Sequence, residues 1–209
     1  RGDVRVLVFD LGGGTFDVTL VEVVGNEINV IATDGDHKLG GKDWDDRVIQ
    51  HVASAFEVKH GVNPLDDLSS YHDLRQKCVS AKISLTRRPK VNIFHDYGSR
   101  VLRLALSRDE FESLTSDLLE RTRRLTESVM QVAGAQPAAI DVILLAGGST
   151  RMPMGLTLSR PGATWLPMGV AGPGCLALSI LPSGPTFPGS HMACLNMMII
   201  PCWTSGNIL

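Results

Sequence analysis

Three consecutive glycines separate two apolar runs near the start of the chain, in the stretch VLVFDLGGGTFDVTLVEV of residues 6–23. Each run has the pattern of a buried strand, so the stretch predicts two neighbouring strands joined by a wide turn. A plain hairpin needs only two turn residues. This turn has more glycine than that, and a carboxylate stands on each side of it, Asp10 before and Asp17 after. The turn is therefore a candidate ligand site as well as a chain reversal.

The glycines of this turn suit the binding of phosphate. Because glycine has no Cβ and tolerates positive φ, the backbone N–H groups of Gly12–Gly14 can point at an anion and approach it closely. Asp10 and Asp17 would repel a bare phosphate, but they suit Mg²⁺ held through water between them and the phosphates. Thr15 would offer its hydroxyl and N–H to the terminal phosphate. The alternative interpretation is a wide glycine turn with two exposed acids.

Two further glycine pairs stand at the ends of predicted elements. Gly40-Gly41 precedes a predicted helix, and Gly147-Gly148 follows a predicted buried strand. The second pair leads into Ser149-Thr150-Arg151, whose guanidinium can lie over a base. Taken singly, each pair is as often a simple turn as a ligand site. No Gly-Lys-Ser/Thr follows the first turn, so the chain has no P-loop there, and the turn leads into a strand, which excludes a dinucleotide-binding fingerprint. Together, the three turns are expected to converge on one cleft.

The remaining pattern predicts a layered α/β domain with a mixed sheet, because strands and helices follow one another in mixed order. Asp43, Asp45 and Asp46 stand in the first turn of a helix, where the helix dipole favours acids, so we expect them to be solvated rather than metal ligands. The histidines before residue 155 have no metal-ligand spacing. The predicted elements are strands at 4–10, 16–24 and 27–33, helices at 43–60 and 71–85, a hairpin within 90–107, one long helix at 108–132 and a strand at 141–146.

Composition limits the partners and marks a boundary. With 209 residues and a formal net charge of −2, the chain has no general attraction for nucleic acid or for an anionic membrane surface. Four cysteines without paired spacing favour a reducing compartment, and no apolar run approaches the roughly 20 residues that span a bilayer. From residue 155 to residue 209 Arg160 is the only Asp, Glu, Lys or Arg, and Pro and Gly are frequent. We expect this tail not to form a cooperative domain.

Three motifs in order carry a resemblance to a known family: FDLGGGTFDVTLVEV, then ATDGDHKLGGKDWDDRVIQH, then VILLAGGSTRMP. The chain resembles the 70-kilodalton heat-shock chaperone family, and more narrowly the second half (lobe II) of its nucleotide-binding domain. The resemblance runs from Val4 to Met154 and implies an actin/sugar-kinase-like (ribonuclease H-like) ATPase fold for residues 1–154. It also implies that the parent is a cytoplasmic chaperone that hydrolyses ATP, assists protein folding and serves the stress response.

The resemblance implies a role for each residue of the motifs. Asp10 and Asp17 match the acids that organise Mg²⁺ and the attacking water, with Thr15 beside them. Lys82 matches a basic residue on the helix over the adenosine. The other matched residues contact the phosphates, the ribose or the adenosine of ATP or ADP: Gly12, Gly13, Gly14, Gly40, Gly41, Gly147, Gly148, Ser149 and Arg151.

The chain departs from the family pattern at three positions near these motifs. Lys42 stands where the family usually has Glu, Val79 where it typically has Glu, and Ile83 where it often has Arg. The last two changes remove a ribose hydrogen bond and a stacking partner. The first lobe of the domain, with its own phosphate loop and lysine, is not in these 209 residues, so we expect the chain alone to lack turnover.

Partners follow from the resemblance as well. A full-length parent would bind unfolded polypeptide clients, a co-chaperone and a nucleotide exchange factor, and it would bind neither nucleic acid nor a membrane. Two alternatives stay open from the residues. One is another actin-like or sugar-kinase ATPase of the same superfold, and the other is a non-catalytic nucleotide-binding or interaction module, which the residues at 42, 79 and 83 favour.

Overall fold

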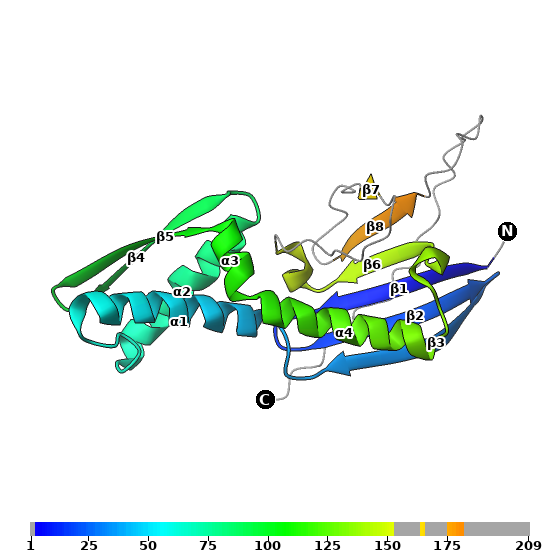
Figure 1. Cartoon of the computed structure of the whole chain (residues 1–209), viewed down its shortest axis with the longest axis horizontal. Coiled ribbons are helices and arrows are strands. Elements are labelled where there is room, and N and C mark those ends of the chain that lie inside the picture. The colour runs from blue at the N-terminus through cyan, green and yellow to red at the C-terminus, as the bar shows by residue number, and fades with distance from the viewer. Residues whose placement is uncertain (1–2, 153–163, 166–174, 182–209) are drawn as a thin grey trace.

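Two groups of elements make up the described part of the molecule. The structure is a computed structural model that describes residues 3–152, 164–165 and 175–181, the last two ranges as backbone only. One group is a six-stranded sheet covered by helix α4, and the other is the β4–β5 hairpin with helices α1, α2 and α3 (Figure 1). The expectation for the tail lies outside the described residues, apart from two strands at 164–165 and 175–181.

The sheet is mixed, as the sequence predicts. Its strand order is β3-β2-β1-β6-β8-β7, in which β1 runs antiparallel to β2 and parallel to β6. The first three strands therefore form a meander, and β6 returns to the middle of the sheet after all the helices. The strands are β1 (Val4–Leu11), β2 (Phe16–Val24), β3 (Glu27–Asp36), β6 (Val142–Ala146), β7 (Thr164–Trp165) and β8 (Cys175–Leu181).

The second group contains most of the helices. Gly61 caps the carboxyl end of helix α1, where it adopts φ 71° and donates its N–H to Glu57 O. Asp67 caps the amino end of helix α2, where its side chain accepts from the Ser70 N–H. Both helices and the hairpin were predicted. The elements are α1 (Gly41–His60), α2 (Leu68–Leu85), β4 (Lys90–Tyr97), β5 (Arg100–Ser107) and α3 (Arg108–Leu114), followed by α4 (Ser116–Val132) and the short 3₁₀ turns η1 (Pro137–Ala139) and η2 (Gly148–Arg151).

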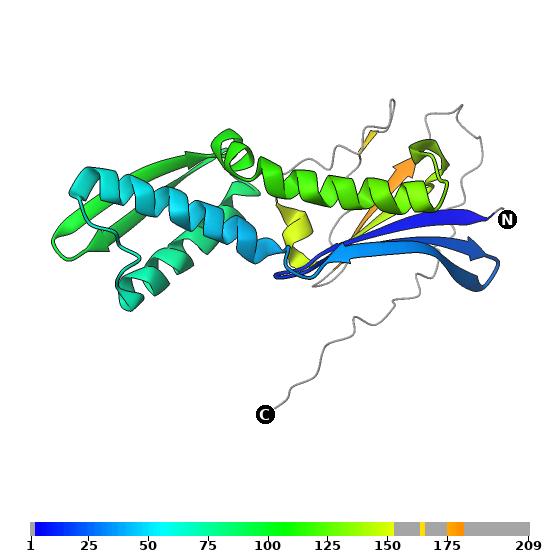
Figure 2. The same cartoon turned by 60° about the horizontal axis from the view of Figure 1, so that its bottom comes forward.

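The prediction of one long helix over 108–132 is wrong, because the helix breaks at Thr115. This residue is fully buried, its backbone leaves the helical region at φ −120° and ψ 11°, and its hydroxyl donates to Phe111 O. Helix α3 packs against β5 and α1 of the hairpin group, whereas α4 packs along β2 and β3 of the sheet (Figure 2). Because of the break, apolar residues before it pack on the hairpin group and those after it pack on the sheet. The helical spacing of the apolar residues continues across Thr115, so it does not reveal the break.

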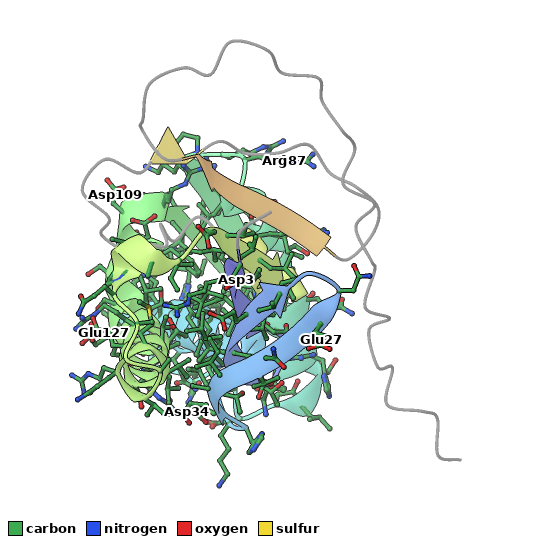
Figure 3. All side chains as sticks on the ribbon, turned by 90° about the vertical axis from the view of Figure 1, so that its right-hand side faces the viewer. Asp3, Glu27, Asp34, Arg87, Asp109 and Glu127 are labelled. Carbon is green, nitrogen blue, oxygen red and sulfur yellow. The ribbon has the colours of Figure 1, made fainter. Side chains whose placement is uncertain are left out.

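The core of the sheet lies between its strands and α4. Leu7, Phe9, Phe16, Val18 and Leu20 alternate inward on β1 and β2 and are almost completely buried. Burying such side chains contributes about 1.5–3 kcal/mol each, so this layer is a principal source of stability for the sheet. Charged side chains such as Glu27, Asp34 and Glu127 lie around the outside (Figure 3).

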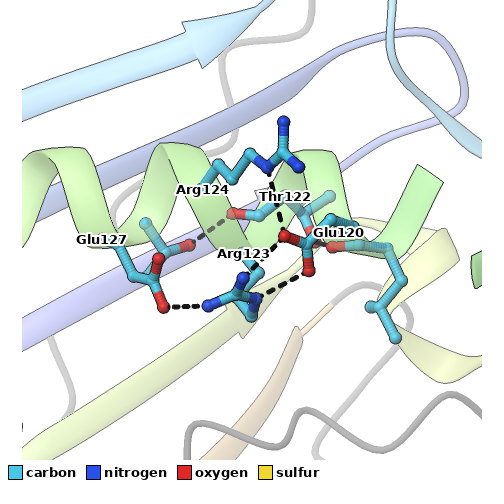
Figure 4. A network of polar contacts seen from close by, with 7 residues as sticks. Glu120, Thr122, Arg123, Arg124 and Glu127 are labelled. Atoms are coloured by element: carbon cyan, nitrogen blue, oxygen red, sulfur yellow. Dashed lines mark hydrogen bonds and ion pairs between the residues drawn. The ribbon is translucent and has the colours of Figure 1, made fainter. Parts of the chain in front are cut away.

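The outer face of α4 carries a network of charges (Figure 4). Arg123 donates to both carboxylate oxygens of Glu120, at 2.6 and 2.7 Å, and also pairs with Glu127, while Arg124 donates to Glu120 at 3.1 Å. The hydrogen bonds from Arg123 and Arg124 lower the pKa of Glu120 to about 2. Because all of these groups are solvent-exposed, they add little to the stability of the fold.

A buried histidine joins the hairpin to helix α2. His95 of β4 is 1% exposed, and its ring lies between Ser70 Oγ, 3.1 Å from Nε2, and Asp73 Oδ2, 3.2 Å from Nδ1. The edge of Phe56 of α1 packs on it, with ring centroids 5.6 Å apart. Burial lowers the pKa of His95, and Lys77 of α2 lowers it further, while Asp73 and the adjacent Asp96 oppose the change. The folded state therefore favours the neutral imidazole more than the unfolded state does.

The stability of the fold is expected to fall as the pH drops through about 6.5. The unfolded histidine takes up a proton near that pH, whereas His95 in the folded state does so only at lower pH, so the unfolded state binds more protons in this window. Urea unfolding between pH 5.5 and 8 measures the effect. His95→Gln should weaken the pH dependence and His37→Gln, an exposed control, should not; an unchanged slope in His95→Gln would assign the dependence to other groups.

Candidate functional site

The three glycine turns meet at the junction of the two groups of elements. The Gly41 N–H donates to Gly12 O at 2.9 Å and the Lys42 N–H donates to Gly13 O at 2.8 Å. From the third turn, Ser149 Oγ donates to the same Gly12 carbonyl at 2.9 Å. The turns are thus joined through one short stretch of backbone, as the sequence analysis expects, and they lie at the ends of β1, β6 and α1.

Glycine is required at two of these positions because backbones touch there. A Cβ on Gly40 would lie 2.3 Å from Gly14 N, and a Cβ on Gly147 would lie 2.2 Å from Leu11 O. Gly147 also has φ 83°, a conformation that side chains disfavour. In contrast, a Cβ on Gly13 or Gly14 would meet nothing within 4 Å. The middle of the first turn therefore presents open backbone to a ligand.

Asp10 and Asp17 face each other across this turn as directly paired residues of β1 and β2. Within residues 3–152 neither carboxylate has a hydrogen bond or an ion pair. Burial, and then the neighbouring charge of Asp17, raise the pKa of Asp10. Two close carboxylates without a cation fit a divalent metal ion. Residues 3–152 contain no cluster of three or more such ligands, so an ion here would take its other ligands from water and phosphate, as Mg²⁺ does.

The expectation that Asp45 is solvated is wrong. Asp45 is 7% exposed, and its Oδ1 lies 2.7 Å from Nζ of Lys82, which is 8% exposed. The same ammonium donates to Gly41 O at 2.8 Å. The pair ties α1 to α2 beside the second glycine turn. A buried lysine needs a counter-ion, but the burial of Lys82 becomes visible only in the fold, so no signal in the sequence identified Asp45. Of its neighbours, Asp43 caps the helix by accepting the Gly40 N–H, at 2.8 Å.

A cleft of about 740 Å³ opens between the last turn of α2 and the turn η2. It brings together four residues that the sequence analysis selected, Lys82, Gly148, Ser149 and Arg151, and it includes Val79 and Ile83. Reasoning from the sequence missed the remaining lining residues, which are Ser84, Thr86, Arg87, Arg88 and Met152. For Ser84, Thr86, Arg87 and Arg88, the position at the carboxyl end of the predicted helix was the available signal; for Met152 it was the place directly after Arg151. The cleft has the size of a site for a small molecule.

No helix in the described part of the chain is both long and apolar enough to cross a membrane. Cys78 is buried in α2, and its burial raises the pKa of the thiol to about 12, so it is an inert core residue.

Comparison with known proteins connects this site to one family. A family model described as Hsp70 protein matches residues 1–157. The chain is 43% identical over 156 residues to the chaperone protein DnaK of Thermosipho melanesiensis, which covers 72% of this chain and 26% of that protein. It is 42% identical over 157 residues to the chaperone protein DnaK of Halobacterium salinarum, covering 72% of this chain and 25% of that protein. The chain spans about a quarter of the length of these curated relatives.

Adding a methyl group to Gly40 is expected to destabilise the fold, because the backbone of Gly14 cannot yield as a flexible side chain would. Overpacking of this kind costs about 1–3 kcal/mol, so Gly40→Ala should lower the urea midpoint clearly. Gly13→Ala is the matched control in the neighbouring turn and should leave the midpoint nearly unchanged, since open space surrounds it. Equal effects of the two changes would show that the turns are not in close contact.

Proposed function

Because the chain belongs to the Hsp70 protein family, we propose that residues 3–152 are the second lobe of its nucleotide-binding domain and that they bind ATP and ADP with Mg²⁺. The observation that carries the proposal is the convergence of three glycine turns on a pair of unpartnered carboxylates, next to a cleft of about 740 Å³. A phosphate site, a cation site and a nucleoside site thus adjoin one another.

The phosphates are assigned to the first two glycine turns. Gly13 and Gly14 offer open backbone, and Thr15 adds a hydroxyl at the end of the turn. Gly40 and Gly41 close the site from the side of α1, whose positive dipole end favours an anion, while the Gly41 and Lys42 N–H groups themselves are held by the carbonyls of Gly12 and Gly13.

Asp10 and Asp17 would hold the metal ion on the sheet side of the phosphates. When bound, Mg²⁺ neutralises phosphate charge and orders water around itself. The protein's own part is to keep the two carboxylates close: they are paired across β1 and β2, and the Asp10 carboxylate lies against the Gly147 turn. Asp17 is exposed, so it can meet water at the edge of the site and orient it for attack on the terminal phosphate.

The nucleoside is assigned to the cleft beside α2. Ile83 and Met152 supply apolar surface for a base, and Arg151 supplies a guanidinium that can stack on it. Gly148 and Ser149 lead from the cleft back to the first turn, where Ser149 Oγ donates to Gly12 O. Lys82 lies at the boundary between nucleoside and phosphates, fixed by Asp45 and Gly41.

The parent protein is proposed to be a chaperone that hydrolyses ATP and assists folding in the cytoplasm, with unfolded polypeptides, a co-chaperone and a nucleotide exchange factor as partners. Similarity to proteins named chaperone protein DnaK supports this proposal. A non-catalytic nucleotide-binding module is the second candidate, favoured by one observation: within residues 3–152 the only lysine that lines the cleft is already paired with Asp45.

The chain is expected to bind Mg²⁺-ADP weakly, in roughly the millimolar range. Calorimetric titration measures the affinity. Asp10→Ala should weaken binding about tenfold or more by removing a metal contact, and chelation of Mg²⁺ should have the same effect on the wild type. Asp109→Ala, an exposed acid on α3, is the control and should bind as the wild type does. Binding that is indifferent to both Asp10 and Mg²⁺ would refute the metal assignment.

Turnover of ATP by these 209 residues is expected not to exceed background. Phosphoryl transfer is catalysed by charges that surround the terminal phosphate, and the described residues place Asp10, Asp17 and Thr15 on one side of it. Each missing electrostatic contact costs on the order of a hundred-fold in rate. A phosphate-release assay measures this. Turnover above a buffer control that disappears in Asp17→Ala would show that the lobe has a complete catalytic site.

A further inference from the structure

The side chains that line the nucleoside cleft donate hydrogen bonds or are apolar. Within residues 3–152 the lining contains no carboxylate and no amide. Its polar side chains are those of Lys82, Arg87, Arg88, Arg151, Ser84, Thr86 and Ser149, and its larger apolar ones those of Val79, Ile83 and Met152. Ammonium and guanidinium groups have no acceptor atom, so only the three hydroxyl oxygens can accept a hydrogen bond from a ligand.

Strong acceptors near the cleft are already occupied. The carboxylate of Asp45 is held by Lys82 at 2.7 Å. The carbonyls at the end of α2 are capped by the guanidinium of Arg108, which donates to Leu85 O at 2.8 Å and to Thr86 O at 3.5 Å. Neither group is therefore open to the hydroxyls of a sugar.

Three guanidinium groups add positive charge to the cleft. Arg87, Arg88 and Arg151 are exposed and have no ion-pair partner among the described side chains. Figure 3 shows the Arg87 side chain at the surface of the molecule. Arg88 and Ser84 also line a second groove of about 610 Å³ between α2 and β4, so positive charge continues beyond the nucleoside cleft.

From this lining we infer that the cleft does not recognise the sugar hydroxyls of its nucleotide. Nucleotides with a deoxy sugar, or with a phosphate on the sugar, bind as well as the corresponding ribonucleotides. The inference rests on the proposed function and specifies which class of nucleotides the site accepts. Its physical basis is that the two neighbouring hydroxyls of a ribose donate two hydrogen bonds, which a carboxylate can accept together, and the described lining of the cleft offers no carboxylate. A phosphate on the sugar only accepts, so the ammonium and guanidinium donors of the lining suit it.

Val79 is the position that tests the inference, because it lines the cleft on α2, one helical turn from Lys82, and its side chain is half-buried. Val79→Glu supplies the missing acceptor. Val101→Glu is the matched control: it makes the same change at an exposed valine of β5 that does not line the cleft.

The experiment is calorimetric titration of the full 209-residue chain and of both variants. The probes are Mg²⁺-ADP against Mg²⁺-2′-deoxy-ADP, and adenosine 3′,5′-bisphosphate against AMP. In the wild type and in Val101→Glu we expect ADP and deoxy-ADP to differ by no more than about twofold, and the bisphosphate to bind at least as tightly as AMP. In Val79→Glu, deoxy-ADP should bind about tenfold more weakly than ADP, as expected for a lost hydrogen bond to a charged group. Like-charge repulsion should also weaken the bisphosphate about tenfold.

The possible failures are distinguishable. A wild-type preference of tenfold or more for ADP over deoxy-ADP would overturn the inference and leave nucleotide binding intact. The same holds if the bisphosphate binds tenfold more weakly than AMP. Absence of binding by every nucleotide would refute the proposed function, and the inference with it. If Val79→Glu unfolds, the wild-type ratios still decide the question, since they require no variant.

Discussion

Direct contact between backbones holds the candidate site together. The carbonyl of Gly12 accepts from the Gly41 N–H and from Ser149 Oγ, so a single peptide group joins the turns after β1, before α1 and after β6. There is no room for a Cβ on Gly40 or Gly147, because a side chain at either position would push the neighbouring backbone away. The same absence of side chains leaves Gly13 open to a ligand. One constraint, close approach of backbone, therefore produces both the junction of the two groups of elements and the phosphate site proposed within it.

A buried ion pair adds a second connection to this junction. Lys82 reaches from α2 to Asp45 of α1 and to the carbonyl of Gly41, and both charged side chains are about 10% exposed. Breaking a pair of this kind by removing one partner typically costs about 3–5 kcal/mol, because the other charge stays buried. The pair thus fixes the distance between α2, which lines the nucleoside cleft, and the glycine turns. Its consequence is that the lysine that lines the cleft is already neutralised by Asp45, so the arginines supply the net positive charge of the described lining.

The sequence predicted the features that repeat along the chain and missed those that depend on contacts between distant residues. Alternation and helical spacing identified strands β1, β2, β3 and β6, the hairpin and helices α1 and α2, and the three glycine turns were correctly expected to lie together. The strands at 164–165 and 175–181 were not predicted. The break at Thr115 was missed because the apolar positions keep helical spacing across it, while the two halves pack on different groups of elements.

Asp45 was expected in solvent because an acid in a first helical turn usually is, and only the fold brings Lys82, 37 residues later, within 2.7 Å. Arg87 and Arg88, after the end of α2, belong to no recognisable sequence motif. They line the cleft because the fold places η2 opposite them.

The distribution of charge bears on how a nucleotide would lie in the site. Two carboxylates stand at the end formed by the sheet, and three guanidinium groups stand at the opposite end, so charge alone would draw phosphates toward the arginines.

The two ends of the site differ, however, in how far their charged groups are exposed to solvent. The arginines are exposed, and interactions of exposed charges contribute about 1 kcal/mol or less each. Asp10 is half-buried and lies beside a turn whose N–H groups are fixed in place, where charge interactions are less screened. A divalent cation between the carboxylates and the phosphates converts the repulsive end into the more attractive one. If the proposed function holds, Mg²⁺ would therefore determine the direction in which the nucleotide binds as well as its affinity, with the acidic pair and the basic cleft as complementary halves of one polar site.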